Sequence, residues 1–309
     1  MPEFGKAANH GPPRRLHQIP GDVFWVHLRA LCQTLHGMQT FAWWRVFALT
    51  LLLPAAAFAQ KKAPMQSEDL EHMREELGVN EFTAPAIDLV FEELAGLKPI
   101  PFDKVWRDLP DAAPQDRARL AMAAGSVIAD GFLAVSAEKQ SRIEPVGRVL
   151  LKLAKGLGVG DRVTKHSRVI LEKSAKQQWA DVRKELTRAQ ADVEAAMISL
   201  KDEELAHLVA LGGWLRGLEM TASIVVEEYT PERARRLIQP ELMDYFLDRV
   251  GTLNPNLKKT KLGQTLSKNL QEAKTIITKR VDAPIDLDEV KRIRELAGDI
   301  NKLIGSPEE

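Results

Sequence analysis

The spacing most suggestive of chemistry is an E-x-x-H step formed by Glu204 and His207. On a helix this step places a carboxylate and an imidazole on one face, as in di-iron carboxylate bundles, which use it twice together with two further glutamates. No second copy is evident, because the position three residues before His166 is Val163. The pair is therefore a candidate metal site, and the competing interpretation is structural, since a single E-x-x-H step is common by chance.

Charged side chains also occur inside two very apolar segments. Asp130 lies within GSVIADGFLAV, and Arg216 and Glu219 lie within GGWLRGLEM. A buried charge must be paired, hydrogen-bonded or placed at a water-filled cavity. Either Asp130 meets Arg216 in a structural ion pair, or these segments surround a cavity for a small polar ligand. The candidate ligand-binding residues are Asp130, His207, Trp214, Arg216 and Glu219.

The same two segments contain glycines, each of which costs about 1 kcal/mol relative to alanine inside a helix. Two explanations are open: close approach between helix backbones, or space for a ligand. The glycines are Gly125, Gly131, Gly212, Gly213 and Gly217.

A third candidate surface is basic. Residues 250–280 contain seven basic side chains and one acid, Glu272, with an apolar stripe at helical spacing on the opposite side. Such a face either is solvated or binds an anionic partner such as a lipid head group, which would give weak contact with an anionic membrane surface. The basic face is represented by Lys258, Lys259, Lys261 and Lys268.

Motifs for hydrolytic catalysis are not found, because the chain has no G-x-S-x-G and no H-E-x-x-H. Gly156, Gly158 and Gly160 spell G-x-G-x-G, but no strand precedes them, so we interpret them as a break between helices. The sequence implies no cofactor and favours a non-catalytic protein.

Composition is that of an ordinary globular protein, with 45% apolar and 28% charged residues. The 43 basic and 43 acidic side chains balance, and removing residues 1–59, which carry five basic and two acidic ones, leaves a slight negative excess. Such a balance gives no case for nucleic-acid binding. The only cysteine is Cys32, so the chain after it has neither disulfides nor thiolate ligands.

A secretion signal is predicted over residues 38–59. Arg45 precedes the apolar run 46–53, and small residues lead to an A-x-A site that predicts cleavage after Ala59. Residues 1–37 precede this signal, which indicates a start assigned too early. We therefore expect an exported protein, periplasmic or secreted, that begins at Gln60.

Residues 60–309 are predicted to form an all-α, compact multi-helix bundle of roughly ten helices without a β-sheet, with a possible subdomain break near 156–160. Start and stop residues divide the chain into short and medium helices, and no segment shows sustained alternation of period two. We expect one helix from Gln115 to about Lys139, helix caps at Asp161 and Asp202, and one helix from Asn254-Pro255 to about Arg280. The clearest periodicity runs from Trp179 to Leu200, where apolar residues alternate in steps of three and four and predict lengthwise packing on a neighbouring helix.

These observations lead to two functional hypotheses. The first is an exported, non-catalytic binding or scaffolding protein of the bacterial envelope, whose partner is an unidentified protein or small molecule. The alternative is a helical bundle, either a binding protein or an enzyme, that binds a small polar ligand or a metal in its interior.

Overall fold

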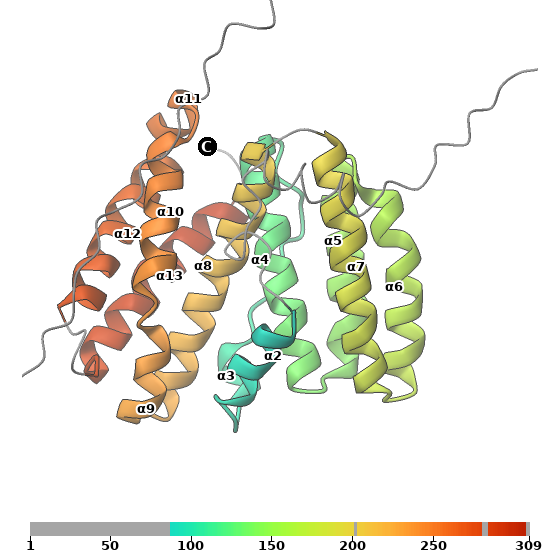
Figure 1. Ribbon diagram of the computed structural model, residues 1–309, viewed down its shortest axis with the longest axis horizontal. Helices are drawn as coiled ribbons and strands as arrows, with labels where there is room; N and C mark the ends of the chain where they lie inside the picture. Colours follow the sequence, from blue (N-terminus) through green and yellow to red (C-terminus); the bar gives the residue numbers. More distant parts are fainter. Residues whose placement is uncertain (1–86, 201–202, 280–283, 307–309) are drawn as a thin grey trace, which may run out of the picture. The chain divides into compact units, whose positions relative to one another are not determined.

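The described part of the chain is helical throughout. The computed structural model describes residues 87–200, 203–279 and 284–306, all within one compact unit that spans residues 63–309. Within these ranges there are α-helices, one 3₁₀ helix and no strand, which confirms the predicted all-α class. The elements, labelled in Figure 1, are α2 (Ile87–Ala95), α3 (Phe102–Val105), α4 (Arg117–Ser136), α5 (Gln140–Leu157), α6 (Gly160–Ala175), α7 (Trp179–Leu200), α8 (Glu203–Glu227), α9 (Pro231–Ala234), η1 (Arg235–Leu237), α10 (Pro240–Thr252), α11 (Pro255–Lys259), α12 (Lys261–Thr278) and α13 (Leu287–Gly305).

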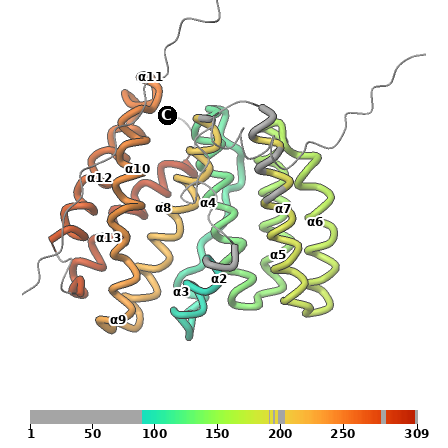
Figure 2. Tube along the Cα trace, in the orientation of Figure 1, coloured from blue at the N-terminus to red at the C-terminus, as the bar shows by residue number. Residues whose placement is uncertain are grey.

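The helices pack in a series in which each contacts the next: α7, α6, α5, α4, α8, α13, α12 and α10. Helices α4 and α8 share the most extensive interface and run parallel, because Met122 lies against Gly212 and, further along both helices, Asp130 meets Arg216. Parallel neighbours need a long crossover, and α5, α6 and α7 provide it on one side of the pair (Figure 2). The largest core cluster extends from α4 and α8 into α10, α12 and α13.

Two helices are long and apolar enough to cross a membrane by length and composition alone. These are α4 and the part of α8 from Glu204 to Glu227, with 72% and 50% of their most apolar windows buried against the rest of the protein. A core helix satisfies the same criterion, and α4 in particular places its apolar surface against α5 and α8.

Several helix boundaries differ from the expected ones. The helix expected from Gln115 to about Lys139 begins at Arg117, because the side chain of Asp116 accepts a hydrogen bond from the backbone N–H of Arg119 and caps it. Asp161, expected to be a cap, lies inside the first turn of α6, where its charge suits the helix N-terminus. The glycine break forms the turn between α5 and α6, with Gly158 at a φ of +86°.

The basic region is not one helix, as we expected from Asn254-Pro255 onward, but two. Thr260 ends α11, and its hydroxyl then accepts a hydrogen bond from the backbone N–H of Gly263 and caps α12. The corner is tight, because a Cβ atom on Gly263 would lie 2.1 Å from the carbonyl oxygen of Leu257. The signal peptide, the preceding leader and the proposed cap at Asp202 lie outside the described residues.

Candidate functional site

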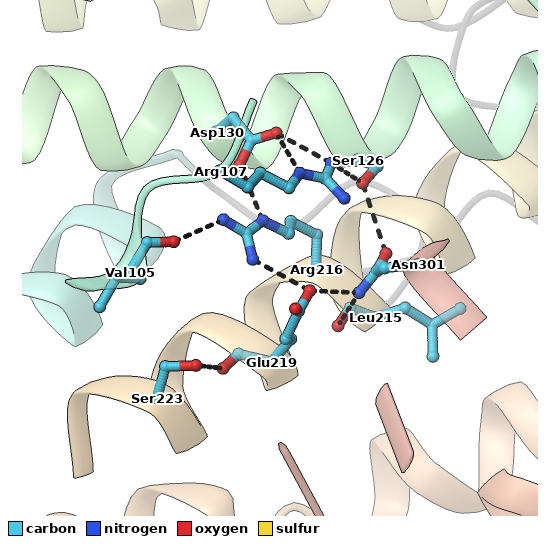
Figure 3. A network of polar contacts seen from close by, with 9 residues as sticks. All are labelled: Val105, Arg107, Ser126, Asp130, Leu215, Arg216, Glu219, Ser223 and Asn301. Carbon is cyan, nitrogen blue, oxygen red and sulfur yellow. Dashed lines mark hydrogen bonds and ion pairs between the residues drawn. The ribbon is translucent and has the colours of Figure 1, made fainter. Parts of the chain in front are cut away.

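The buried acid and the buried arginine predicted from sequence meet across the α4–α8 interface. The Nε of Arg216 donates to Oδ1 of Asp130 over 2.7 Å, and its Nη2 donates to the carbonyl oxygen of Val105 over 2.9 Å. Only 1% of Arg216 and none of Asp130 is exposed. Figure 3 shows this pair at the centre of a larger polar network.

A second arginine, which the sequence analysis did not single out, lies on the other side of the same acid. Arg107 belongs to the irregular connector between α3 and α4, and its Nε and Nη2 donate to Oδ2 of Asp130 over 3.0 and 2.9 Å. Its Nη2 also donates to the hydroxyl of Ser126. Two guanidinium groups therefore hold the two oxygens of one buried carboxylate.

The network continues from Arg216 towards α13. The Nη1 of Arg216 donates to Oε2 of Glu219 over 2.9 Å, and the same oxygen accepts from Nδ2 of Asn301 over 2.8 Å. Asn301 also donates to the carbonyl oxygen of Leu215 and accepts from the hydroxyl of Ser126 (Figure 3). Side chains from α4, α8, α13 and the 106–116 connector are thus tied together.

The charges of this network balance, because two guanidinium groups face two carboxylates. Burial alone would lower the pKa of Arg216, but the charges and hydrogen bonds of Asp130 and Glu219 outweigh burial and raise that pKa. Every ionisable member has an oppositely charged partner within hydrogen-bond distance. The network therefore has the properties of a structural ion-pair network that holds these elements together.

The glycines divide into two groups. A Cβ atom on Gly125 would lie 1.9 Å from the carbonyl oxygen of Val209, and one on Gly212 would lie 2.0 Å from that of Met122. At these two positions close backbone approach accounts for the glycine. Gly217 has no atom within 4 Å of such a Cβ, so packing does not require glycine there.

Glu204 and His207 point to different partners. Oε1 of Glu204 accepts from the backbone N–H of Asn254 over 3.2 Å, whereas Nδ1 of His207 lies 2.7 Å from the hydroxyl of Tyr245. Within residues 87–200, 203–279 and 284–306, no three histidine, cysteine, aspartate or glutamate side chains are grouped so as to hold a metal. Trp214 stacks on the ring of Phe246, with centroids 4.8 Å apart.

A second buried polar cluster joins α6 to α7. Nδ1 of His166 lies 2.8 Å from Oε1 of Glu185, and its Nε2 lies 2.9 Å from Oδ2 of Asp192. Arg188 donates to the other oxygen of Glu185 over 3.0 Å. Because an ionised carboxylate oxygen only accepts, a ring that donates to both acids must carry a proton on each nitrogen.

A groove of about 1010 Å³ lies where several helix ends meet. The first turns of α4, α8 and α12, the short helix α11 and the last two turns of α13 line it. Its charged lining residues are Asp116, Arg117, Arg119, Glu204, Lys261, Asp299 and Lys302. Of the residues predicted from sequence, the groove includes Glu204 and Lys261 and none of the interior network.

The four lysines of the predicted basic face lie on two helices, Lys258 and Lys259 on α11 and Lys261 and Lys268 on α12. Lys258, Lys259, Lys261 and Lys268 are exposed, while the opposite stripe is buried against α10 and α13. The buried stripe consists of Leu262, Leu266, Leu270, Ala273 and Ile277.

Comparisons with known proteins add no family or fold relative: no family model, curated protein or solved structure matches the chain. The functional assignment therefore rests on the geometry of this molecule.

Proposed function

We propose that the protein is an exported, non-catalytic binding protein of the bacterial envelope and that the groove between the ends of α4, α8, α12 and α13 is its binding site. The observation that carries the proposal is the groove itself. Its volume of about 1010 Å³ is at the upper end of the range of small-molecule sites, roughly 300–1,000 Å³.

The interior network supports this choice over an interior ligand site. Asp130 and Arg216 already have partners on each side, so a ligand would have to displace a protein group to reach them. The groove residues Lys261 and Lys302, in contrast, form no ion pair or hydrogen bond through their side chains within the described residues.

The export part of the proposal depends on the signal over residues 38–59. The secreted protein should begin at Gln60, and a chain that starts at Met38 should be exported as well as the full one. Intact-mass measurement tests both statements. Secreted material that retains residues 1–59 would contradict the first, and loss of export from Met38 would contradict the second.

The binding part is tested by site-specific photocross-linking in the native host. A benzophenone side chain at Asn256, in the groove, should give a defined adduct, and the same group at Gln271, exposed on α12 outside the groove, should not. Adducts are identified by mass spectrometry. Equal adducts at both positions, or an adduct at Gln271 alone, would overturn the assignment.

A variant whose groove is filled by a larger side chain provides the matched control for the cross-linking experiment. Thr265→Trp places a large side chain in the groove and should abolish the Asn256 adduct, whereas Thr275→Trp, on the same helix outside the groove, should leave it unchanged. Circular dichroism confirms that both variants fold.

A second candidate function is peripheral attachment to an anionic membrane through the basic face. The exposure of Lys268 on the side of α12 opposite a buried apolar stripe, together with that of Lys258 and Lys259 on α11, favours it. Co-sedimentation with vesicles containing roughly 30–40% phosphatidylglycerol, at low and high salt, measures this attachment. The two salt concentrations are compared because surface charges are screened within about 10 Å at 0.1 M salt. Binding that does not weaken with salt would exclude this electrostatic mode.

A further inference from the structure

The groove contains cationic side chains without partners. Four basic side chains line it, and two of them, Lys261 at the start of α12 and Lys302 near the end of α13, form no side-chain ion pair or hydrogen bond within the described residues. An ammonium group in such a position is available to a ligand.

The acidic side chains of the groove are partly engaged by the protein. Oδ1 of Asp116 accepts from the backbone N–H of Arg119 over 2.8 Å, and Oε1 of Glu204 accepts from the backbone N–H of Asn254 over 3.2 Å. Asp299 is the remaining acid in the lining and is exposed on α13. The acids therefore offset the cations only in part.

Helix polarity adds positive potential. Helices α4, α8 and α12 all begin at the groove, so the partial positive charge of three helix N-termini faces it. Helices α11 and α13 end there, and Arg119 donates to two terminal carbonyl oxygens of α13, those of Leu303 and Ser306. The C-terminal end of α13 is thus covered by a protein cation.

An independent observation is a buried donor that lacks an acceptor. Arg119 is a half-buried side chain that lines the groove, and its Nε atom is buried and has no hydrogen-bond partner among the described residues. Leaving a buried donor unsatisfied costs roughly 1–3 kcal/mol, more for a charged group. An oxygen atom of a ligand can satisfy this donor only if the Arg119 side chain shifts, because the Nε atom itself is buried.

We propose that the groove binds an anionic oxygen group, a phosphate or a carboxylate, of a small ligand, and that Lys261, Lys302 and Arg119 are its binding residues. This inference rests on the groove being the binding site in the proposed function. Phosphate and carboxylate share the chemistry that these cations recognise.

Isothermal titration calorimetry of the full exported protein with inorganic phosphate and, separately, with citrate tests the proposal and distinguishes the two groups. At least one anion should bind, and Lys261→Ala and Lys302→Ala should each weaken binding about tenfold, the equivalent of one charge-assisted hydrogen bond. Lys268→Ala is the matched control, because Lys268 is exposed on the same helix outside the groove, and its effect should stay below about twofold.

Two results would overturn the inference. One is that neither anion binds, and the other is that Lys268→Ala weakens binding as much as Lys261→Ala, which would indicate a general basic surface. Either result combined with a groove-specific adduct at Asn256 would leave the proposed binding function standing with a different ligand class. Absence of the adduct as well would remove both.

Discussion

The α4–α8 and α6–α7 interfaces both hold polar side chains, and they do so in opposite ways. Between α4 and α8 the backbones touch at Gly125 and Gly212, and Arg216 is bonded on several sides by groups from different elements. Between α6 and α7 a single histidine joins two acids of one helix, and its outer partner, Asp192, has a side chain that is 44% exposed. The central pair of the first interface, Asp130 and Arg216, is cut off from solvent, whereas the second interface remains connected to it.

This difference indicates where the stability of the protein is concentrated. Removing one partner from a closed buried network leaves a charge that cannot reach water, which costs about 3–5 kcal/mol. In the α6–α7 cluster water can replace the lost contact of an exposed partner, so the loss should be smaller.

The largest expected effect comes from the glycine contacts. Gly212→Ala or Gly125→Ala would place a methyl group about 2 Å from a backbone oxygen, so the helices must separate, and we expect the free energy of unfolding to fall by about 3 kcal/mol or more. Gly217→Ala, with open space around its Cβ, is the control and should be neutral or up to about 1 kcal/mol stabilising. Urea denaturation measures all three. Equal stability of the Gly212 and Gly217 variants would show that the two backbones are not in contact.

An effect of comparable size is expected at the buried ion pair. Arg216→Met and Asp130→Asn should each cost about 3–5 kcal/mol, with Arg216→Met at the lower end because Arg107 still faces Asp130. The double variant should recover part of the loss through a coupling free energy of about 0.5–3 kcal/mol. Chemical denaturation of the four-member cycle gives the coupling. Additive effects near zero would mean that both side chains reach water and that the interface is not closed.

The α6–α7 cluster should respond to acid. Burial raises the pKa of Glu185, but the hydrogen bonds and charges of His166 and Arg188 lower it more, so the net pKa lies below the ordinary 4.5. A carboxylate with a lowered folded-state pKa contributes stability above its unfolded pKa, and this contribution is lost as the pH falls through the folded value. Glu185→Gln should therefore cost about 1.5–3 kcal/mol near pH 6 and progressively less below pH 4.5.

The control for this acid response is Glu144→Gln, since Glu144 is an exposed partner of Arg148 with a side chain that is 66% accessible. It should change stability by no more than about 0.5 kcal/mol. Thermal denaturation from roughly pH 3 to pH 7 measures the stability of both variants as a function of pH. A difference between wild type and Glu185→Gln that does not vary with pH would contradict the proposed role of the cluster.

The smallest effect is expected at Leu186, in the periodic stripe of α7. Helix α7 packs on α6, and within the stripe Val182 is buried whereas Leu186 is only half-buried. Leu186→Ala should cost about 1–2 kcal/mol, less than Leu215→Ala in α8, which is fully buried and should cost about 2–5 kcal/mol. Equal losses of the free energy of unfolding, measured by urea denaturation, would show that the α6–α7 region contributes to stability as much as the core does.

The fold class and the central ion pair were accessible from sequence because each follows from a local pattern. Helical periodicity with caps specifies the helices, and an acid and an arginine in two apolar segments must find partners. Arg107 was not accessible, because it stands in an irregular connector among ordinary polar residues and becomes central only when the chain folds back along α4.

Glu185 and Asn301 were missed for a different reason. Glu185 lies next to the apolar stripe position Leu186 and reads as a solvated charge, yet it is buried because His166 on α6 meets it. Asn301 follows Ile300 on the apolar side of α13, and its amide is used by Leu215 and Ser126 from elsewhere in the chain. The groove likewise has no sequence signature, since it is formed by helix ends that are distant in sequence.

The attachment of Arg107 to Asp130 has a consequence for proteolysis. The connector 106–116 has no helix or strand and would ordinarily be a preferred site of cleavage. Trypsin must take an arginine side chain into the acidic pocket that sets its specificity, whereas here the guanidinium of Arg107 is already held by a buried acid and by Ser126. The bond after Arg107 should therefore be cut only when this contact opens. The rate of tryptic cleavage at this bond would then report how often the protein's interior opens.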